Sequence, residues 1–121
     1  MKILYIHTGR LEENKANIIQ ALQMCRGFSA CGQEVTLAIN TYTFSQPEVE
    51  IRICEELSLS KLPFEVKAFT GKTFLGALRS IGCVGAVKRV ASQVPHDVCF
   101  IRDAVLYPLV QPYLPAVIFE A

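Results

Sequence analysis

Blocks of apolar and polar positions alternate along this chain and predict strands and helices in turn. Short apolar runs rich in β-branched or aromatic residues predict strands at Lys2–His7, Glu34–Ile39, Phe64–Phe69, Asp97–Ile101 and Pro115–Phe119. Apolar residues at helical spacing predict helices at Lys15–Cys31, Pro47–Ser60 and Thr73–Val94, and a short one at Ala104–Val110. This order predicts an α/β fold with a Rossmann-like, doubly wound parallel sheet of about five strands.

The residues that end the first predicted strand and the first predicted helix place the loop between them at an edge of the sheet where ligands bind. Thr8-Gly9 closes the first strand, and the segment up to Asn14 is polar except for Leu11. Gly32 stands where a left-handed cap would end the first helix. A right-handed crossover then lays the second strand parallel to the first, so the loop opens at the carboxyl edge of the sheet, where such folds bind ligands.

The helix over 73–94 is the least regular of the predicted elements. Thr73 is its expected N-cap. Gly76, Gly82 and Gly85 each weaken it by about 1 kcal/mol relative to alanine. Close packing on the sheet would account for these glycines.

Composition indicates one domain over residues 1–121. The hydrophobic content of 51% is enough for a core buried on both faces of a sheet, and the net charge of +1 gives no electrostatic case for nucleic acid. No apolar run reaches the roughly 20 residues of a membrane span, and no signal leader precedes the first strand. We therefore expect a cytoplasmic protein, either free or peripheral at the inner face of the membrane.

The cysteines and histidines do not form a metal or disulfide pattern. The five cysteines are odd in number and lie mostly on predicted helix or strand faces, which favours reduced, buried thiols. His96 and Cys99 flank the start of a strand without a second pair nearby, so we expect no metal site.

The chain ends directly after its last predicted strand, with no helix to cover that strand. We expect it to be the front piece of a larger protein whose C-terminal domain is absent. A homodimer that covers the fifth strand is the alternative arrangement.

Several nucleotide-binding patterns are missing or partial. The first loop has Gly9 but not G-x-G-x-x-G, and no G-x-x-x-x-G-K-[ST] string occurs. A phosphoacceptor domain would need clustered acidic residues after strand one. Thr8-Gly9 partly imitates a flavodoxin-like phosphate loop, but Glu12-Glu13 would repel the phosphate.

Two strings resemble the amino-terminal domain of the family 4 retaining glycosyltransferases, which have two Rossmann-like domains (the GT-B architecture). The first is N-K-A-N-I-I-Q over residues 14–20, continued by Q-M-C at 23–25 and G-Q-E-V-T-L at 32–37. The second is I-R-D at 101–103 followed by P-A-V-I-F-E-A at 115–121. The departures are Ile19 and Gln33, where serine and histidine are commoner, and a single Gly9 in place of a glycine pair.

The resemblance implies transfer of a sugar from a nucleotide-sugar donor to a glycan, lipid or small-molecule acceptor, with retention of configuration and without a metal or a separate cofactor. In that family the amino-terminal domain holds the acceptor, and the other domain holds the nucleotide and a pair of glutamates. The catalytic residues are therefore unknown here, and we expect this chain to be inactive alone. The alternative is a stand-alone Rossmann-like or flavodoxin-like binding module without catalysis.

The residues expected to bind substrate end the predicted strands or begin the first helix: Thr8, Gly9, Lys15, Asn17, Arg102, Asp103 and Glu120. Gly9 allows close approach of a backbone, and Lys15 and Asn17 lie near the positive end of a helix dipole. A plain structural interpretation is that Asn17 caps the helix and that Lys15 is solvated.

The remaining candidates have structural alternatives as well. Arg102 either pairs with an anionic ligand group or forms a salt bridge with Asp103 or Glu120. Glu120, at the end of a buried strand, must face a cleft or a cation. His7, which ends the first strand, is more simply a satisfied histidine at the core edge than a base.

Overall fold

The chain folds into a parallel sheet with helices on both faces, as its sequence predicts. A computed structural model describes residues 1–12, 15–71, 81–114 and 116–119, and of Lys15 only its place in a helix. The five strands are ordered β3-β2-β1-β4-β5, and neighbours pair in parallel. They span Lys2–Arg10 (β1), Glu34–Asn40 (β2), Glu65–Phe69 (β3), Val98–Ile101 (β4) and Val117–Phe119 (β5).

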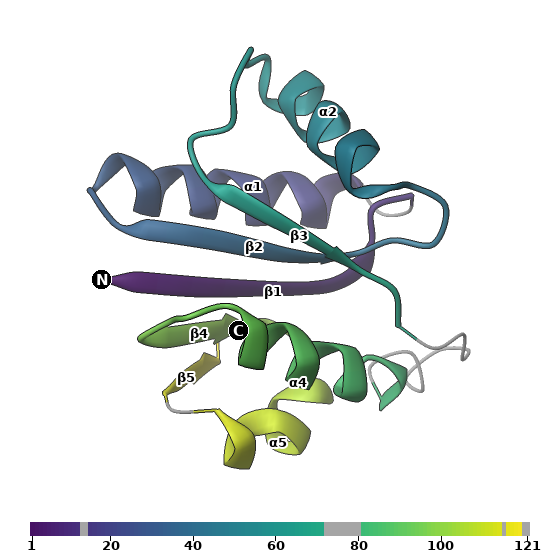
Figure 1. Cartoon of the computed structure of the whole chain (residues 1–121), viewed down its shortest axis with the longest axis vertical. Helices are drawn as coiled ribbons and strands as arrows, with labels where there is room; N and C mark the ends of the chain where they lie inside the picture. The colour runs from purple at the N-terminus through teal and green to yellow at the C-terminus, as the bar shows by residue number, and fades with distance from the viewer. Residues whose placement is uncertain (13–14, 72–80, 115, 120–121) are drawn as a thin grey trace.

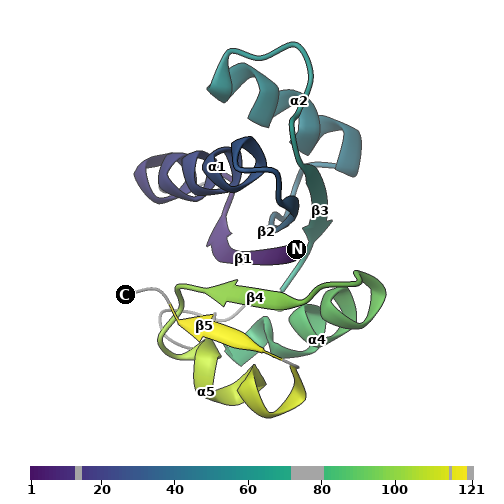
Figure 2. The same cartoon turned by 90° about the vertical axis from the view of Figure 1, so that its left-hand side faces the viewer.

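The helices divide between the two faces of the sheet. They are α1 (Lys15–Ala30), α2 (Gln46–Leu57), α4 (Val84–Gln93) and α5 (Leu106–Val110), followed by a 3₁₀ turn at Gln111–Tyr113. Helices α1 and α2 cover one face, and α4 and α5 cover the other (Figures 1 and 2). The chain winds from β1 outward to β3 and then returns beside β1 with β4. The strand order therefore reverses between β1 and β4, which is the switch point where open α/β sheets bind ligands.

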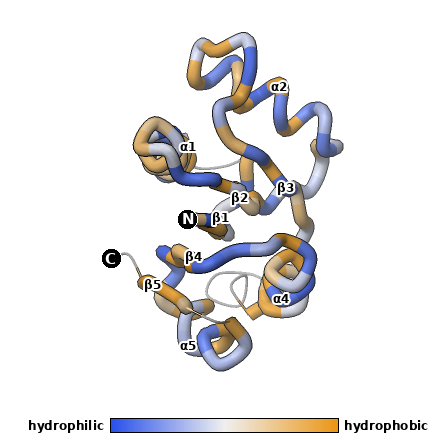
Figure 3. Tube along the Cα trace, turned by 60° about the vertical axis from the view of Figure 1, so that its left-hand side comes forward, coloured by the Kyte–Doolittle hydropathy of each residue, from blue (hydrophilic) through white to orange (hydrophobic). Residues whose placement is uncertain are grey.

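Two apolar cores explain the continuous apolar run in β1. Ile3 and Tyr5 belong to the core under α1 and α2, whereas Leu4 and Ile6 belong to the core over α4 and α5. A strand that is buried on both faces has apolar side chains on both, so its sequence does not alternate between apolar and polar residues. Helix α2 lies at the outside and alternates between hydrophilic and hydrophobic residues along its length (Figure 3).

The ends of α1 and α2 follow from local sequence. Gly32 has φ +86°, which confirms the predicted left-handed cap of α1, and the N–H of Gln33 donates to the Phe28 carbonyl at 3.1 Å. Ser45 and Glu48 form a reciprocal capping box at the start of α2. Helix α2 ends at Leu57 and not at the predicted Ser60, because Ser58 adopts a left-handed conformation (φ 55°).

Two further predicted boundaries are wrong. Strand β1 continues past Thr8-Gly9 to Arg10, because Arg10 pairs with Asn40 at the end of β2. The predicted helix over 73–94 is not continuous, because Cys83 is in a turn before α4 begins at Val84. The first part of that prediction, including Thr73 and Gly76, lies outside the described residues.

Within the described ranges, no helix is both long enough and apolar enough to cross a membrane.

Candidate functional site

A bulge at the end of β1 forms the centre of the switch point. His7 pairs with Ile39 and Arg10 pairs with Asn40, so Thr8 and Gly9 are two extra residues on β1 relative to β2. Bulges of this kind interrupt pairing and redirect side chains, and they are common beside active sites. Here the bulge coincides with two of the predicted binding residues.

The bulge is joined to the end of β4 by a side-chain hydrogen bond. The Thr8 hydroxyl donates to Asp103 Oδ2 at 2.7 Å, across 95 residues of sequence. Asp103 Oδ1 accepts from the N–H groups of Val105 and Leu106 at 2.9 and 3.0 Å, so the same carboxylate anchors the start of α5. The structure thus brings Thr8 and Asp103 together, and both are engaged with protein groups.

Arg102 and His7 directly follow the last residues that pair between β4 and β1, and both continue the positions of those strands that face α1. His7 continues the odd-numbered positions of β1, after Ile3 and Tyr5, and is 8% exposed. Burial and the nearby Arg102 guanidinium lower the pKa of His7 to about 4. The imidazole is therefore neutral at neutral pH. The sequence favours a satisfied histidine at His7, but its Nε2 has no hydrogen-bond partner in the part of the chain that the structure describes.

Gly9 is required by a close approach to His7. A Cβ at residue 9 would lie 3.0 Å from His7 Nε2. The sequence predicts that Gly9 admits the backbone to a ligand, and in the structure the group that it accommodates is this imidazole.

The rest of the loop after β1 is held by the loop after β2. The Glu12 carboxylate accepts hydrogen bonds from the N–H groups of Tyr42 and Thr43 at 2.8 and 2.9 Å, and from the hydroxyls of Thr41 and Thr43, both at 2.9 Å. Partial burial raises the pKa of Glu12, but these hydrogen bonds outweigh it and lower the pKa to about 2. The Arg10 guanidinium stacks on the Tyr42 ring at 3.5 Å and donates to its hydroxyl. Glu12 is thus an anchor of this loop.

Asn40 connects the bulge to the loop after β3 and was not predicted. Its fully buried side-chain amide donates to the Thr8 carbonyl at 2.9 Å, and its Oδ1 accepts from the Gly71 N–H at 3.1 Å. Asn40 Nδ2 also lies 3.7 Å from Cys83 Sγ. The signal available in the sequence was an asparagine directly after the apolar run of the second predicted strand.

The other predicted binding residues are placed only in part. Asn17 is exposed in the first turn of α1, which already begins at Lys15, so Asn17 does not cap the helix. The first turn of α1 contains no acidic residue. The side chain of Lys15, and Glu120 altogether, lie outside the described residues.

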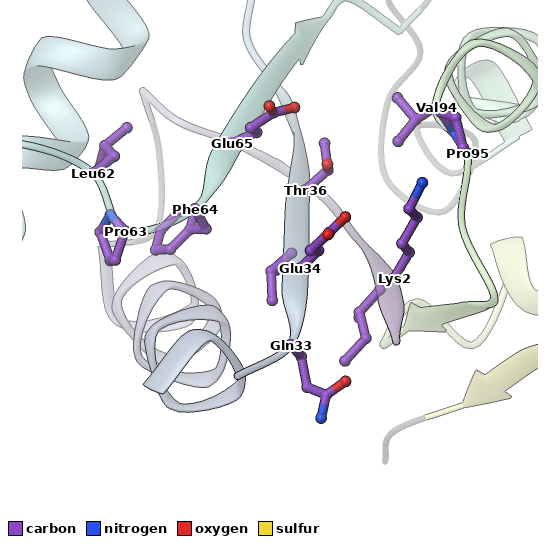
Figure 4. A pocket seen from close by; sticks show the side chains of 12 residues that line it. Lys2, Gln33, Glu34, Thr36, Leu62, Pro63, Phe64, Glu65, Val94 and Pro95 are labelled. Carbon is purple, nitrogen blue, oxygen red and sulfur yellow. The ribbon is translucent and has the colours of Figure 1, made fainter. Parts of the chain in front are cut away.

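A hollow lies at the opposite, amino edge of the sheet. It has a volume of about 520 Å³, and Lys2, Glu34 and Glu65 are among its lining residues (Figure 4). Figure 4 shows the Lys2 side chain extending toward Val94 and Pro95. The predicted binding residues are at the other edge.

The thiols and acidic groups do not assemble into a metal centre in the described part of the chain. No three His, Cys, Asp or Glu side chains there are placed to hold one ion. All five cysteines are free thiols: Cys25, Cys83 and Cys99 are buried and Cys31 is exposed.

Comparison with known proteins defines the fold of this chain but not its activity. No family model and no curated protein matches it. Among solved structures, the C-terminal domain of a hydrogenase from Pyrococcus furiosus is similar, with a TM-score of 0.56 and 16% identity over 99% of this chain and 91% of that domain. A likeness at this identity shows a shared Rossmann-like α/β fold, and such folds serve many functions.

Proposed function

We propose that this chain is the N-terminal, acceptor-side domain of a retaining glycosyltransferase with two Rossmann-like domains. Each of the two strings that resemble that family has one part next to the switch point, the start of α1 for the first and the end of β4 for the second. The first covers the start of α1 and the beginning of β2, and the second covers the end of β4 and the segment with β5. The proposal thus joins a sequence resemblance to the part of the sheet where ligands bind.

The observation that carries the proposal is the hydrogen bond between Thr8 and Asp103, with Arg102 beside it at the switch point. This bond fixes the two strand ends that would form one wall of a cleft. Sugar transfer also needs a second wall, because charge on the leaving diphosphate and on the sugar must be stabilised in a closed site with little water. A partner domain would supply that wall and the nucleotide-binding residues.

The test compares this chain with the protein encoded by the complete reading frame, by following release of nucleoside diphosphate from a panel of nucleotide sugars with candidate acceptors. We expect transfer by the complete protein and none by the 121-residue chain alone. In the complete protein, Thr8→Val should lower kcat/KM because the strand ends lose their link, whereas Ser92→Ala on α4 should leave it unchanged. Transfer by the short chain, or no transfer by the complete protein with any donor, would contradict the proposal.

The second candidate function is a stand-alone binding module that associates through β5. Ile118 and Phe119 are 46% and 38% exposed on this terminal strand of the sheet, and Tyr113 nearby in sequence is 64% exposed. Such an edge favours association with another strand. If this candidate is right, the chain should form a dimer in sedimentation experiments, and Ile118→Lys should convert the dimer to a monomer.

The flavodoxin-like form of that second candidate receives no support from the strand order. Flavodoxin-like sheets have the order 2-1-3-4-5, whereas this sheet has β3-β2-β1-β4-β5. A visible absorbance spectrum of the purified chain would reveal a bound flavin directly.

A further inference from the structure

His7 is a buried polar group that the described part of the fold leaves unsatisfied at the switch point. Its side chain is more than nine-tenths buried, and Nε2 has no hydrogen-bond partner there. Buried polar groups are nearly always paired in native proteins, so each exception needs a physical explanation. A site for a ligand group is one such explanation.

The surroundings of His7 favour an anion as that ligand. Its neighbour on β2 is the apolar Ile39. On the other side Ile6 pairs with Ile101 of β4. Arg102 is therefore the next residue along beside His7, and, besides burial, its positive charge lowers the pKa of His7.

Helix α1 follows on the same face, and its first turn has no acidic residue. The N-terminal end of a helix is positive, so Arg102 and α1 contribute charge of the same sign. The nearby carboxylates of Asp103 and Glu12 carry negative charge, but both accept hydrogen bonds from groups of the fold.

Gly9 controls the space around Nε2. The position of a Cβ at residue 9 lies 3.0 Å from this nitrogen, so a larger residue would press on the imidazole. Glycine places no side chain at this point, and its conformational freedom would permit the backbone shift by which a ligand oxygen reaches the nitrogen.

We propose that His7 and Arg102 bind an anionic group of the substrate, a phosphate or a carboxylate, at the carboxyl ends of β1 and β4. The neutral imidazole donates one hydrogen bond from Nε2–H to an oxygen of the anion, and the Arg102 guanidinium donates to the same group. The inference rests on the proposed function, because the nucleotide-sugar donor or an acidic acceptor would supply the anion. It adds His7 to the site and names the chemical class that the site recognises.

The test follows the Cε1–H resonances of the histidines of this chain by nuclear magnetic resonance. The chain has two histidines, and His96 is an internal control at the opposite edge of the sheet. Its Nδ1 lies 2.8 Å from the Val94 carbonyl before β4, and its Nε2 also lacks a partner among the described residues. The probes are inorganic phosphate, UDP and glucuronate. We expect a saturable shift of the His7 signal and an upward shift of the pKa of His7 upon binding, with the His96 signal unchanged.

The three probes distinguish the source of the anion. Tighter binding of UDP than of phosphate would assign the group to the donor diphosphate, and tighter binding of glucuronate would assign it to an acidic acceptor. Absence of a saturable His7 shift with all three probes, or an equal shift of His96, would overturn the inference and leave a bound water as the partner of His7.

Variants separate binding from folding. His7→Gln and Arg102→Gln should each weaken binding of the best probe roughly 10-fold, whereas Arg26→Gln on the exposed side of α1 should have no effect. The dispersed amide spectrum of each variant shows whether it is folded, and His7→Asn replaces His7→Gln if the latter is not. Unchanged affinity in a folded Arg102→Gln variant would also overturn the inference.

The outcomes also separate this inference from the proposed function. If the complete protein transfers sugar but this chain shows no anion-dependent shift of His7, the function stands and the anion site is wrong. If this chain binds the anion but the complete protein transfers no sugar, the anion site stands and the transferase proposal is wrong.

Discussion

Individual polar residues at the end of β1 have roles set by partners that are distant in sequence. The sequence predicts that Glu12 repels a phosphate from the loop after β1, yet its carboxylate accepts four hydrogen bonds from residues 41–43. His7 lacks such partners in the described residues, although it is more deeply buried. The end of β1 and the loop after it therefore contain one acid that is fully engaged in the fold and one histidine whose Nε2 has no partner among the described residues.

The Glu12 anchor predicts an acid-dependent part of the stability. Because the pKa of Glu12 is lowered to about 2 from 4.5, the unfolded chain binds the extra proton between these values, so this stabilisation is present above pH 4.5 and is lost as the pH falls toward 2. We expect Glu12→Gln to lower the free energy of unfolding by about 1 kcal/mol at neutral pH, since the carboxylate is largely exposed. Urea unfolding of both proteins across this range measures the difference, which should shrink on acidification.

The control for this experiment is Glu50→Gln on the exposed surface of α2. An equal loss of stability in that variant, or a Glu12→Gln difference independent of pH, would contradict the anchor.

At the scale of elements, capping residues determine a helix end where their hydrogen-bond partners are near in sequence. Ser45 with Glu48 and Gly32 with Phe28 act within a few residues. The Gly32 cap lies at its predicted place, whereas the Ser45 cap was not predicted. The ends of β1 and of the helix over 73–94 depend instead on other elements. Arg10 is kept in β1 by Asn40 of β2, and Cys83 lies against Gly71 after β3. Sequence periodicity contains no information on these contacts.

Substitution of two glycines by alanine should change the stability of the folded chain in opposite directions. Gly27 is exposed within α1, and an added Cβ would meet nothing within 4 Å, so Gly27→Ala should stabilise the chain by about 0.5–1 kcal/mol. At Gly71 the Cβ would lie 2.6 Å from Cys83 Sγ, so Gly71→Ala should destabilise by about 1–3 kcal/mol. Urea unfolding measures both. Cys83→Ala should reduce the Gly71→Ala penalty, and an unchanged penalty would show that this contact is not its cause.

For the whole molecule, the two apolar cores share one sheet. Cys25 lies in the core under α1 and α2, and Cys99 lies in the core over α4 and α5. Burial raises the pKa of Cys99 to about 12, so its thiol does not react in the folded chain. Since β1 contributes to both cores, we expect both faces to unfold together.

Thiol labelling followed by peptide mass spectrometry tests this cooperativity. The exposed Cys31 should react at once, whereas Cys25 and Cys99 should react slowly and with the same protection free energy. All five thiols should react rapidly in about 6 M guanidinium chloride. Protection of Cys99 that is lost well before that of Cys25 would show that the two faces open separately.

Much of the fold and part of the site could be predicted from sequence. The alternation of apolar runs fixed the α/β class, and the rule that ligands bind at strand ends selected Thr8, Gly9, Arg102 and Asp103, which the structure places at one switch point. Asn40 could not be assigned in this way, because its role depends on hydrogen bonds to residues about 30 positions away along the chain.

The sequence by itself determined the order of elements, the caps of α1 and α2, and the burial of β1 on both faces, because these depend on propensity and periodicity within short segments. The tertiary structure alone decided the strand order, the bulge at Thr8-Gly9 and the unsatisfied state of His7 Nε2. The physical reason is that register and hydrogen-bond satisfaction depend on which segments become neighbours in the packed sheet, and that choice depends on the total burial of both faces.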